Sequence, residues 1–170
     1  PNQINQIREF PEIQGSIFFS SKTFESNPNG WNDSLRNNYY RYPAICPPMP
    51  WIDETKPEAP ELIIASAQPV GADNTIALYL RQEQPNDLIN RYVIYQFSDE
   101  NKQDITDPKN IHEIIITGHD FYTFDLNKVP ASQTRIAIAV TALTRTNNES
   151  GKSNYILLER TGKGWKVLED

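Results

Sequence analysis

Residues 134–143, with the sequence TRIAIAVTAL, form the longest regular alternation of side-chain types in the chain. Ile136, Ile138, Val140 and Ala142 occupy every second position of this stretch. Because successive side chains of a β-strand point to opposite faces, these four residues would share one face. The stretch therefore predicts a β-strand with that face toward a core.

Stretches with the same two-residue period lie on both sides of it, and the connectors between them carry the Gly, Pro, Asn and Asp residues typical of turns. Seven short strands in about 100 residues predict a mainly β fold, a Greek-key sandwich of immunoglobulin or fibronectin type. The sandwich takes residues 61–160. Residues 161–170 are a tail or an edge segment in which Trp165 covers the sandwich. The predicted strands are residues 61–67, 75–81, 91–97, 112–118, 121–126, 134–143 and 153–159.

A proline-rich segment precedes the sandwich. Residues 42–60, YPAICPPMPWIDETKPEAP, hold six of the 13 prolines. Each proline fixes φ and removes a backbone donor, so residues 43–60 are predicted to form a stiff, extended strap. Met49, Trp51 and Ile52 are apolar, and we expect them to be buried and to pin the strap to a neighbouring surface. The prolines around Cys46 suggest that its thiol is buried as well.

Residues 1–42 have a different pattern. A helix ending near Pro11 is followed by an apolar run, EIQGSIFFS (residues 12–20), that predicts a buried strand. A turn leads into a second helix over residues 31–42, capped by Asn32 or Asp33. One such α/β unit cannot bury both faces of its strand. We therefore expect residues 1–42 to be the C-terminal remnant of a larger α/β domain.

The bulk composition excludes some classes of protein. The net charge is −6 and no stretch concentrates Lys and Arg with aromatic residues, which argues against nucleic acid as a partner. The longest apolar run is too short for a transmembrane segment. A single cysteine excludes an intrachain disulfide. The chain starts at Pro1 without a Met, which indicates a missing upstream part.

The stretches APELIIASA, TIALYL, NRYVIYQF, ITGHDFYTF and IAIAVTALTRTNNESGKS together resemble a fibronectin type III domain. The stretch YYRYPAICPPMPW resembles the junction in bacterial family-10-like glycoside hydrolases, where a (β/α)8 barrel is followed by such a strap and module. The sequence departs from the module's pattern at Leu80, where a Trp is common, and at Ile136 or Ile138, where the corner tyrosine is expected.

This resemblance implies that residues 12–24 contain the eighth barrel strand and residues 31–40 the last helix. The catalytic carboxylates of such barrels come from earlier strands, so no catalytic residue and no cofactor are expected here. The family is usually exported in bacteria, often as lipoproteins, which implies a periplasmic, cell-surface or extracellular location. The implied partner is an upstream barrel domain of the same protein, with a polysaccharide as a further candidate.

The candidate substrate contacts follow from the barrel interpretation. Ser20, Ser21 and Lys22 would lie at the C-terminal end of the strand, where barrel active sites form. Trp31 could stack on a sugar ring, or it could pack against the adjoining helix.

Other residues invite a functional interpretation that their positions do not support. Glu9 and Glu12 flank a helix end and should be solvated rather than catalytic. A metal site made of His112, Glu113, His119 and Asp120 is not predicted, because the two pairs sit at opposite ends of one strand, about 20 Å apart. We expect residues 148–150 to shape the turn between the last two strands through side-chain hydrogen bonds to the backbone.

Three functions remain open from the sequence. The favoured one is the non-catalytic C-terminal region of a secreted glycoside hydrolase, with the sandwich as an accessory or stabilising module. The alternative is a free-standing fibronectin type III-like module that binds a carbohydrate or a protein. The third is a purely structural module that joins domains.

Overall fold

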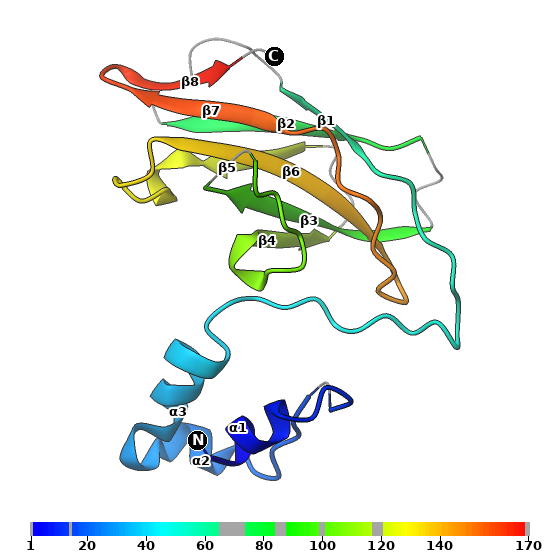
Figure 1. The fold of residues 1–170 in the computed structure, drawn as a ribbon, viewed down its shortest axis with the longest axis vertical. Coiled ribbons are helices and arrows are strands. Elements are labelled where there is room, and N and C mark those ends of the chain that lie inside the picture. Colours follow the sequence, from blue (N-terminus) through cyan, green and yellow to red (C-terminus); the bar gives the residue numbers. More distant parts are fainter. Residues whose placement is uncertain are drawn as a thin grey trace. The chain divides into compact units, whose positions relative to one another are not determined.

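The computed structural model describes residues 2–13, 15–64, 74–83, 88–98, 101–116 and 121–168. The chain forms two compact units, Pro1–Pro43 and Ala44–Asp170. Figure 1 shows that the described part of the first unit is built of short helices, whereas that of the second is built mainly of strands. No helix in these residue ranges is long and apolar enough to cross a bilayer.

The second unit is a sandwich of two antiparallel sheets. The three-stranded sheet has the order β1-β2-β5, formed by Glu61–Ile64, Thr75–Arg81 and Phe121–Asp125. The five-stranded sheet has the order β4-β3-β6-β7-β8, formed by Ile111–Ile116, Ile89–Phe97, Arg135–Thr144, Ile156–Thr161 and Gly164–Leu168. Two 3-10 helices, η3 (Pro108–Asn110) and η4 (Leu126–Lys128), precede β4 and follow β5.

The predicted mainly β sandwich is confirmed, and the predicted alternation places the core between the two sheets. The described residues hold an eighth strand, β8, beyond the seven predicted. Residues 65–67 and 117–118 of the predicted strands lie outside the described residues. The inward-facing side chains include Ile76, Leu78 and Leu80 of β2, Phe124 of β5, and Ile136, Ile138, Val140 and Ala142 of β6.

The last strand contributes one large side chain to this core. Trp165 of β8 is 5% exposed and belongs to the central cluster, so the prediction that it covers the sandwich is confirmed. The Arg160 guanidinium lies over the Trp165 indole, with its Cζ 4.6 Å from the centre of the ring. The positions that depart from the fibronectin pattern, Leu80, Ile136 and Ile138, are buried and fill the core with aliphatic groups.

The outer face of the five-stranded sheet is also buried. Val93, Tyr95 and Phe97 of β3 pack there with Ile111 of β4 and with Ala137, Ala139 and Leu143 of β6. Two segments outside the sheet cover this second cluster: Ile45 comes from the strap, and Ile105 comes from the β3–β4 connection. Strand β6 is therefore buried on both faces, which explains why its sequence is apolar almost throughout.

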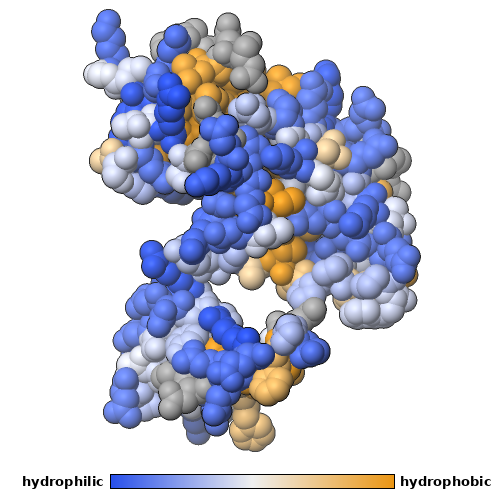
Figure 2. All heavy atoms as spheres, in the orientation of Figure 1, coloured by the Kyte–Doolittle hydropathy of each residue, from blue (hydrophilic) through white to orange (hydrophobic). Residues whose placement is uncertain are grey.

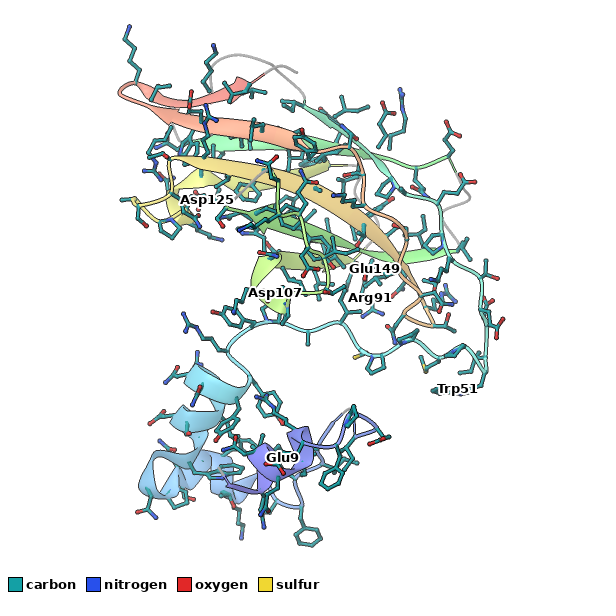
Figure 3. The ribbon with its side chains drawn as sticks, in the orientation of Figure 1. Glu9, Trp51, Arg91, Asp107, Asp125 and Glu149 are labelled. Atoms are coloured by element: carbon teal, nitrogen blue, oxygen red, sulfur yellow. The ribbon has the colours of Figure 1, made fainter. Side chains whose placement is uncertain are left out.

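The strap forms no helix or strand between Pro43 and Pro60, as its prolines predict, but it turns at residues 49–53, where the Ile52 N–H donates to the Met49 carbonyl over 3.0 Å. The prediction that Trp51 and Ile52 pin it is wrong, because these side chains are 78% and 65% exposed. Figure 3 shows Trp51 at the outer bend of the strap. Met49 is partly buried, and Ile45 makes the apolar contact instead. The prediction of a buried thiol is wrong as well, since Cys46 is exposed.

The first unit contains five short helical segments among its described residues: α1 (Asn2–Arg8), α2 (Lys22–Ser26), η1 (Pro28–Gly30), α3 (Trp31–Ser34) and the π-helix η2 (Leu35–Tyr39). Ile4 of α1 and Leu35 of η2 are its buried aliphatic residues. Arg8 joins the two helices, because its Nη2 donates to the Tyr39 carbonyl over 2.6 Å. The predicted helices at both ends of this unit are present.

The predicted strand in residues 12–20 is wrong. The described residues of this stretch form no strand, and the side chains of Ile17 and Phe19 are fully exposed. A parallel strand needs neighbours on its edges and apolar cover on both faces, and the described chain supplies neither here. Figure 2 shows hydrophobic atoms at the surface of this unit, the lower body in the picture.

The predicted cap of the second helix is also wrong. Helix α3 begins at Trp31, before both Asn32 and Asp33. Asn27 serves the helix instead, since its Oδ1 accepts from the Asn32 backbone N–H over 2.8 Å and from that of Asp33 over 3.4 Å. Asn27 has a positive φ of 42°, a conformation that Asn adopts more readily than most residues. A loop asparagine therefore satisfies the free amide groups of this helix end.

Candidate functional site

The predicted substrate contacts of the first unit lie close together in the chain. Ser20, Ser21 and Lys22 are exposed, and Lys22 is the first residue of α2. The Lys22 backbone N–H donates to Ser20 Oγ over 3.3 Å. These contacts order the start of the helix, and a role of the three residues toward a substrate stays a prediction.

Trp31 lies in a cluster of three aromatic rings. Its ring is 5.3 Å from that of Phe18 and 5.1 Å from that of Phe24, both in edge-to-face arrangements. Phe18 and Phe24 are themselves 5.4 Å apart. The packing role weighed for Trp31 is thus present, and the rings hold α2 and α3 against the segment before them.

The most densely bonded site of the second unit lies where the strap meets the β6–β7 connection. Residues 145–155 of that connection do not pair with β6 as a regular strand. Instead, the backbone N–H groups of Ala142 and Val140 donate to Ser150 Oγ and Ser153 Oγ, each over 2.9 Å. The prediction that residues 148–150 shape this turn through side-chain hydrogen bonds to the backbone holds for Ser150, whereas Asn148 bonds the backbone of the strap and Glu149 bonds other side chains.

Two asparagines of this turn bind the strap. Asn148 is 4% exposed, and its Nδ2 donates to the carbonyl oxygens of Asp53 over 2.7 Å and of Thr55 over 3.1 Å. Asn147 Nδ2 donates to the Pro47 carbonyl over 3.3 Å. We call Asn147 and Asn148, with the strap carbonyls that they bind, the asparagine latch. The latch was not foreseen, because its donors and acceptors are 93 to 100 residues apart in the sequence.

One strap amide completes the contact in the opposite direction. The Met49 backbone N–H donates to the Thr146 carbonyl over 2.9 Å. Strap and turn thus exchange hydrogen bonds in both directions, much as two strands would, although neither segment is a strand here.

A polar network between the β6–β7 connection and side chains of β3 and β6 holds the connection in place. Glu149 Oε1 accepts from the Tyr95 hydroxyl over 2.7 Å and from Thr141 Oγ1 over 2.6 Å. The pKa of Tyr95 is strongly raised, first because the ring is buried and then because the hydroxyl donates to the Glu149 carboxylate. Arg91 donates to Asn147 Oδ1. Figure 3 shows Arg91 and Glu149 on the same side of the sandwich. Because the hydroxyls of Tyr95 and Thr141 both donate to the Glu149 carboxylate, these groups serve to position the latch.

A depression of about 420 Å³ lies beside the latch. Its lining includes Ile45, Cys46, Lys56, Ile105 and Glu149. The strap forms one wall and the β6–β7 turn forms another. The depression is thus a consequence of the way in which the strap is held.

His112 lies in the second unit at an irregularity of the sheet. Ile94 pairs with Glu113 and Tyr95 pairs with Ile111, so His112 is the extra residue of a β-bulge. Its ring stacks on Phe124 at 4.3 Å. Glu113 is bonded by the Tyr122 hydroxyl. His119 and Asp120 lie outside the described residues, and no group of three or more metal-ligating residues occurs within them.

Together, these features define the second unit as a β-sandwich module with a docked N-terminal strap. A part of the chain is similar to a known enzyme: over 60 residues it is 43% identical to the glycosyl hydrolase YngK of Bacillus subtilis (strain 168). The match covers 35% of this chain and 12% of that protein, so the chain spans about an eighth of this relative. No protein-family model matches the chain. The similarity supports a relationship with glycoside hydrolases.

We predict that Asn148→Ala destabilises the second unit. The substitution removes both hydrogen bonds to the strap and leaves the carbonyls of Asp53 and Thr55 without these donors. We expect the free energy of unfolding to fall by about 1–3 kcal/mol, measured by urea denaturation followed by far-UV circular dichroism. Ser132→Ala, at an exposed position of the same unit, is the control and should change little. Equal stability of the two variants would contradict the latch.

We further predict a pH dependence of stability at His112. Burial lowers the pKa of its imidazole below the ordinary value of 6.5; Lys128 lowers it further, and the nearby carboxylates of Glu113 and Asp125 oppose the shift. As the pH falls through 6.5, the unfolded chain binds a proton there before the folded chain does. The stability from neutral His112 is therefore present above that pH and is lost below it.

His112→Phe tests this prediction, because it keeps an aromatic ring next to Phe124 and removes the titrating group. The melting temperature of the wild type should fall more steeply than that of the variant between about pH 7.5 and pH 5.5. His119 is common to both proteins and cancels in the comparison. Parallel melting curves across this range would show that His112 does not contribute.

Proposed function

We propose that this chain is the non-catalytic C-terminal region of a secreted glycoside hydrolase, in which the sandwich is an accessory module that stabilises a neighbouring α/β body. The observation that carries the proposal is the 43% identity over 60 residues to a glycosyl hydrolase. Fold alone does not define function, so the proposal depends on this similarity together with the architecture of the two units.

The sheet order supports a module of fibronectin type III kind. The first, second and fifth strands form one sheet, whereas the third, fourth, sixth and seventh lie in the other. Immunoglobulin-like sandwiches divide their strands between two sheets in a closely related way, with Greek-key connections. In this proposal β8 is an addition at the edge of the larger sheet, next to β7.

Exposed apolar residues of the first unit support the proposal that this unit belongs to a larger α/β body. Ile17 and Phe19 are fully exposed and belong to an apolar run that has the composition of a buried strand. Exposed apolar residues grouped in this way are typical of a surface that another part of the protein covers. We propose that the body of a family-10-like (β/α)8 barrel covers the surface that carries Ile17 and Phe19.

The proposal assigns roles to the candidate residues. Ser20, Ser21 and Lys22 follow this apolar run, and in the proposed barrel they would lie beside the substrate groove, where barrel active sites form. Trp31 would support them through the ring cluster with Phe18 and Phe24. An exported hydrolase would act in the periplasm, at the cell surface or outside the cell, with the first unit as part of the barrel.

The upstream reading frame and the full-length protein test this proposal. We expect the upstream sequence to contain the remaining strand–helix repeats of a barrel, with acidic residues at two strand ends. The full-length protein should hydrolyse a polysaccharide, substitution of either acid should abolish the activity, and Ser132→Ala should not. The present chain alone should be inactive on the same substrate. An upstream sequence without such repeats, or hydrolysis by this chain alone, would overturn the proposal.

A further inference from the structure

A polar depression at one end of the sandwich is separate from the latch. It has a volume of about 430 Å³ and lies where β3 ends, β4 begins and the chain approaches β6. Figure 3 shows Asp107 on the connection that leads into β4. The polar side chains that line the depression are Gln96, Asp107, Lys109, Asn110, His112 and Gln133.

His112, the extra residue of the β-bulge, lines this depression. A regular strand would alternate Ile111, His112 and Glu113 between the two faces of the sheet, but the bulge shifts the register at His112. Phe124 covers one face of the imidazole at 4.3 Å. Within the described residues the ring makes no hydrogen bond, so its two nitrogens can offer one donor and one acceptor to a ligand.

The two glutamines provide a second pair of complementary groups. Gln96 Nε2 donates to Gln133 Oε1 over 3.0 Å, which fixes both side chains side by side. Within the described part of the chain, Gln96 Oε1 and Gln133 Nε2 have no further partner. They leave one acceptor and one donor at the same wall of the depression.

The charges of the depression are balanced. Asp107 and Lys109 carry opposite charges, and the Asp107 carboxylate accepts from the Lys109 backbone N–H over 3.0 Å. An adjoining depression of about 620 Å³ shares Asp107 and Asn110 and adds Lys102 and Asp104, again one charge of each sign. An anion such as a phosphate would need an excess of positive charge, which this surface does not have.

We propose that this depression binds the end of a neutral oligosaccharide. A sugar hydroxyl donates one hydrogen bond and accepts others, which matches the donor and acceptor groups of His112, Gln96 and Gln133 in the lining. The choice of a sugar over another neutral polar ligand rests on the proposed function, since a module attached to a glycoside hydrolase meets saccharide chains. The sandwich would then hold a substrate chain as well as stabilise its neighbour.

Isothermal titration calorimetry of the chain with cellopentaose, xylopentaose and N-acetylchitopentaose tests the site. We expect at least one of these probes to bind and to shift the NMR signals of the His112 ring. His112→Phe, which keeps the aromatic stack, and Gln133→Leu should each weaken binding by about tenfold, the equivalent of one hydrogen bond. Inorganic phosphate should not bind.

Tyr122→Phe is the matched control. It removes the hydroxyl that bonds Glu113, next to His112 in the sequence, but it does not line the depression, and binding should be unchanged. Failure of all three sugars to bind, or equal affinity of the wild type and both lining variants, would overturn the site. This test and that of the proposed function can fail separately. If a sugar binds but the upstream sequence holds no barrel, the binding site stands and the hydrolase proposal fails. If the upstream barrel is present but no sugar binds, the hydrolase proposal stands and the binding site fails.

Discussion

The structure depends on hydrogen bonds to the backbone carbonyls of the strap, a segment that cannot form regular structure. The prolines of the strap carry no N–H and prevent pairing in a sheet, yet the strap carbonyls still offer acceptors that need donors. Asn148 meets this need with one buried amide that reaches two carbonyls, and Asn147 binds a third. A buried asparagine without these partners would be costly, so turn and strap stabilise each other.

The same contact explains why the larger sheet can be apolar on both faces. With the strap in place, Ile45 lies on the outer cluster of β3, β4 and β6, and Ile105 adds to the cover. Tyr95 is buried beneath this layer, and its hydroxyl donates to Glu149. Glu149 thereby holds in place the β6–β7 connection, which carries the two asparagines. Packing, hydrogen bonding and the course of the strap are therefore one connected arrangement, and the strap belongs to the sandwich unit.

Sequence reasoning predicted the elements whose cause is local. The alternation in β2, β3 and β6 defined the core between the sheets, and the prolines defined an extended strap. It failed where the cause is distant: the strap is held by donors from residues 147–148, so the local apolar character of Trp51 and Ile52 was misleading. The apolar run of residues 12–20 has the composition of a strand but no described neighbour to pair with. The role of His112 depends on a register shift that no local pattern reveals.

The amide of Met49 reports most directly on whether the strap is fixed to the sandwich. Its N–H donates to the Thr146 carbonyl, although Met49 lies in a segment with no regular structure. Native-state hydrogen exchange measured by NMR should show this amide protected to nearly the same extent as the amides of β6 that hold the turn, such as that of Ala142. Exchange of the Met49 amide at the rate of an open chain, with the Ala142 amide still protected, would contradict the account.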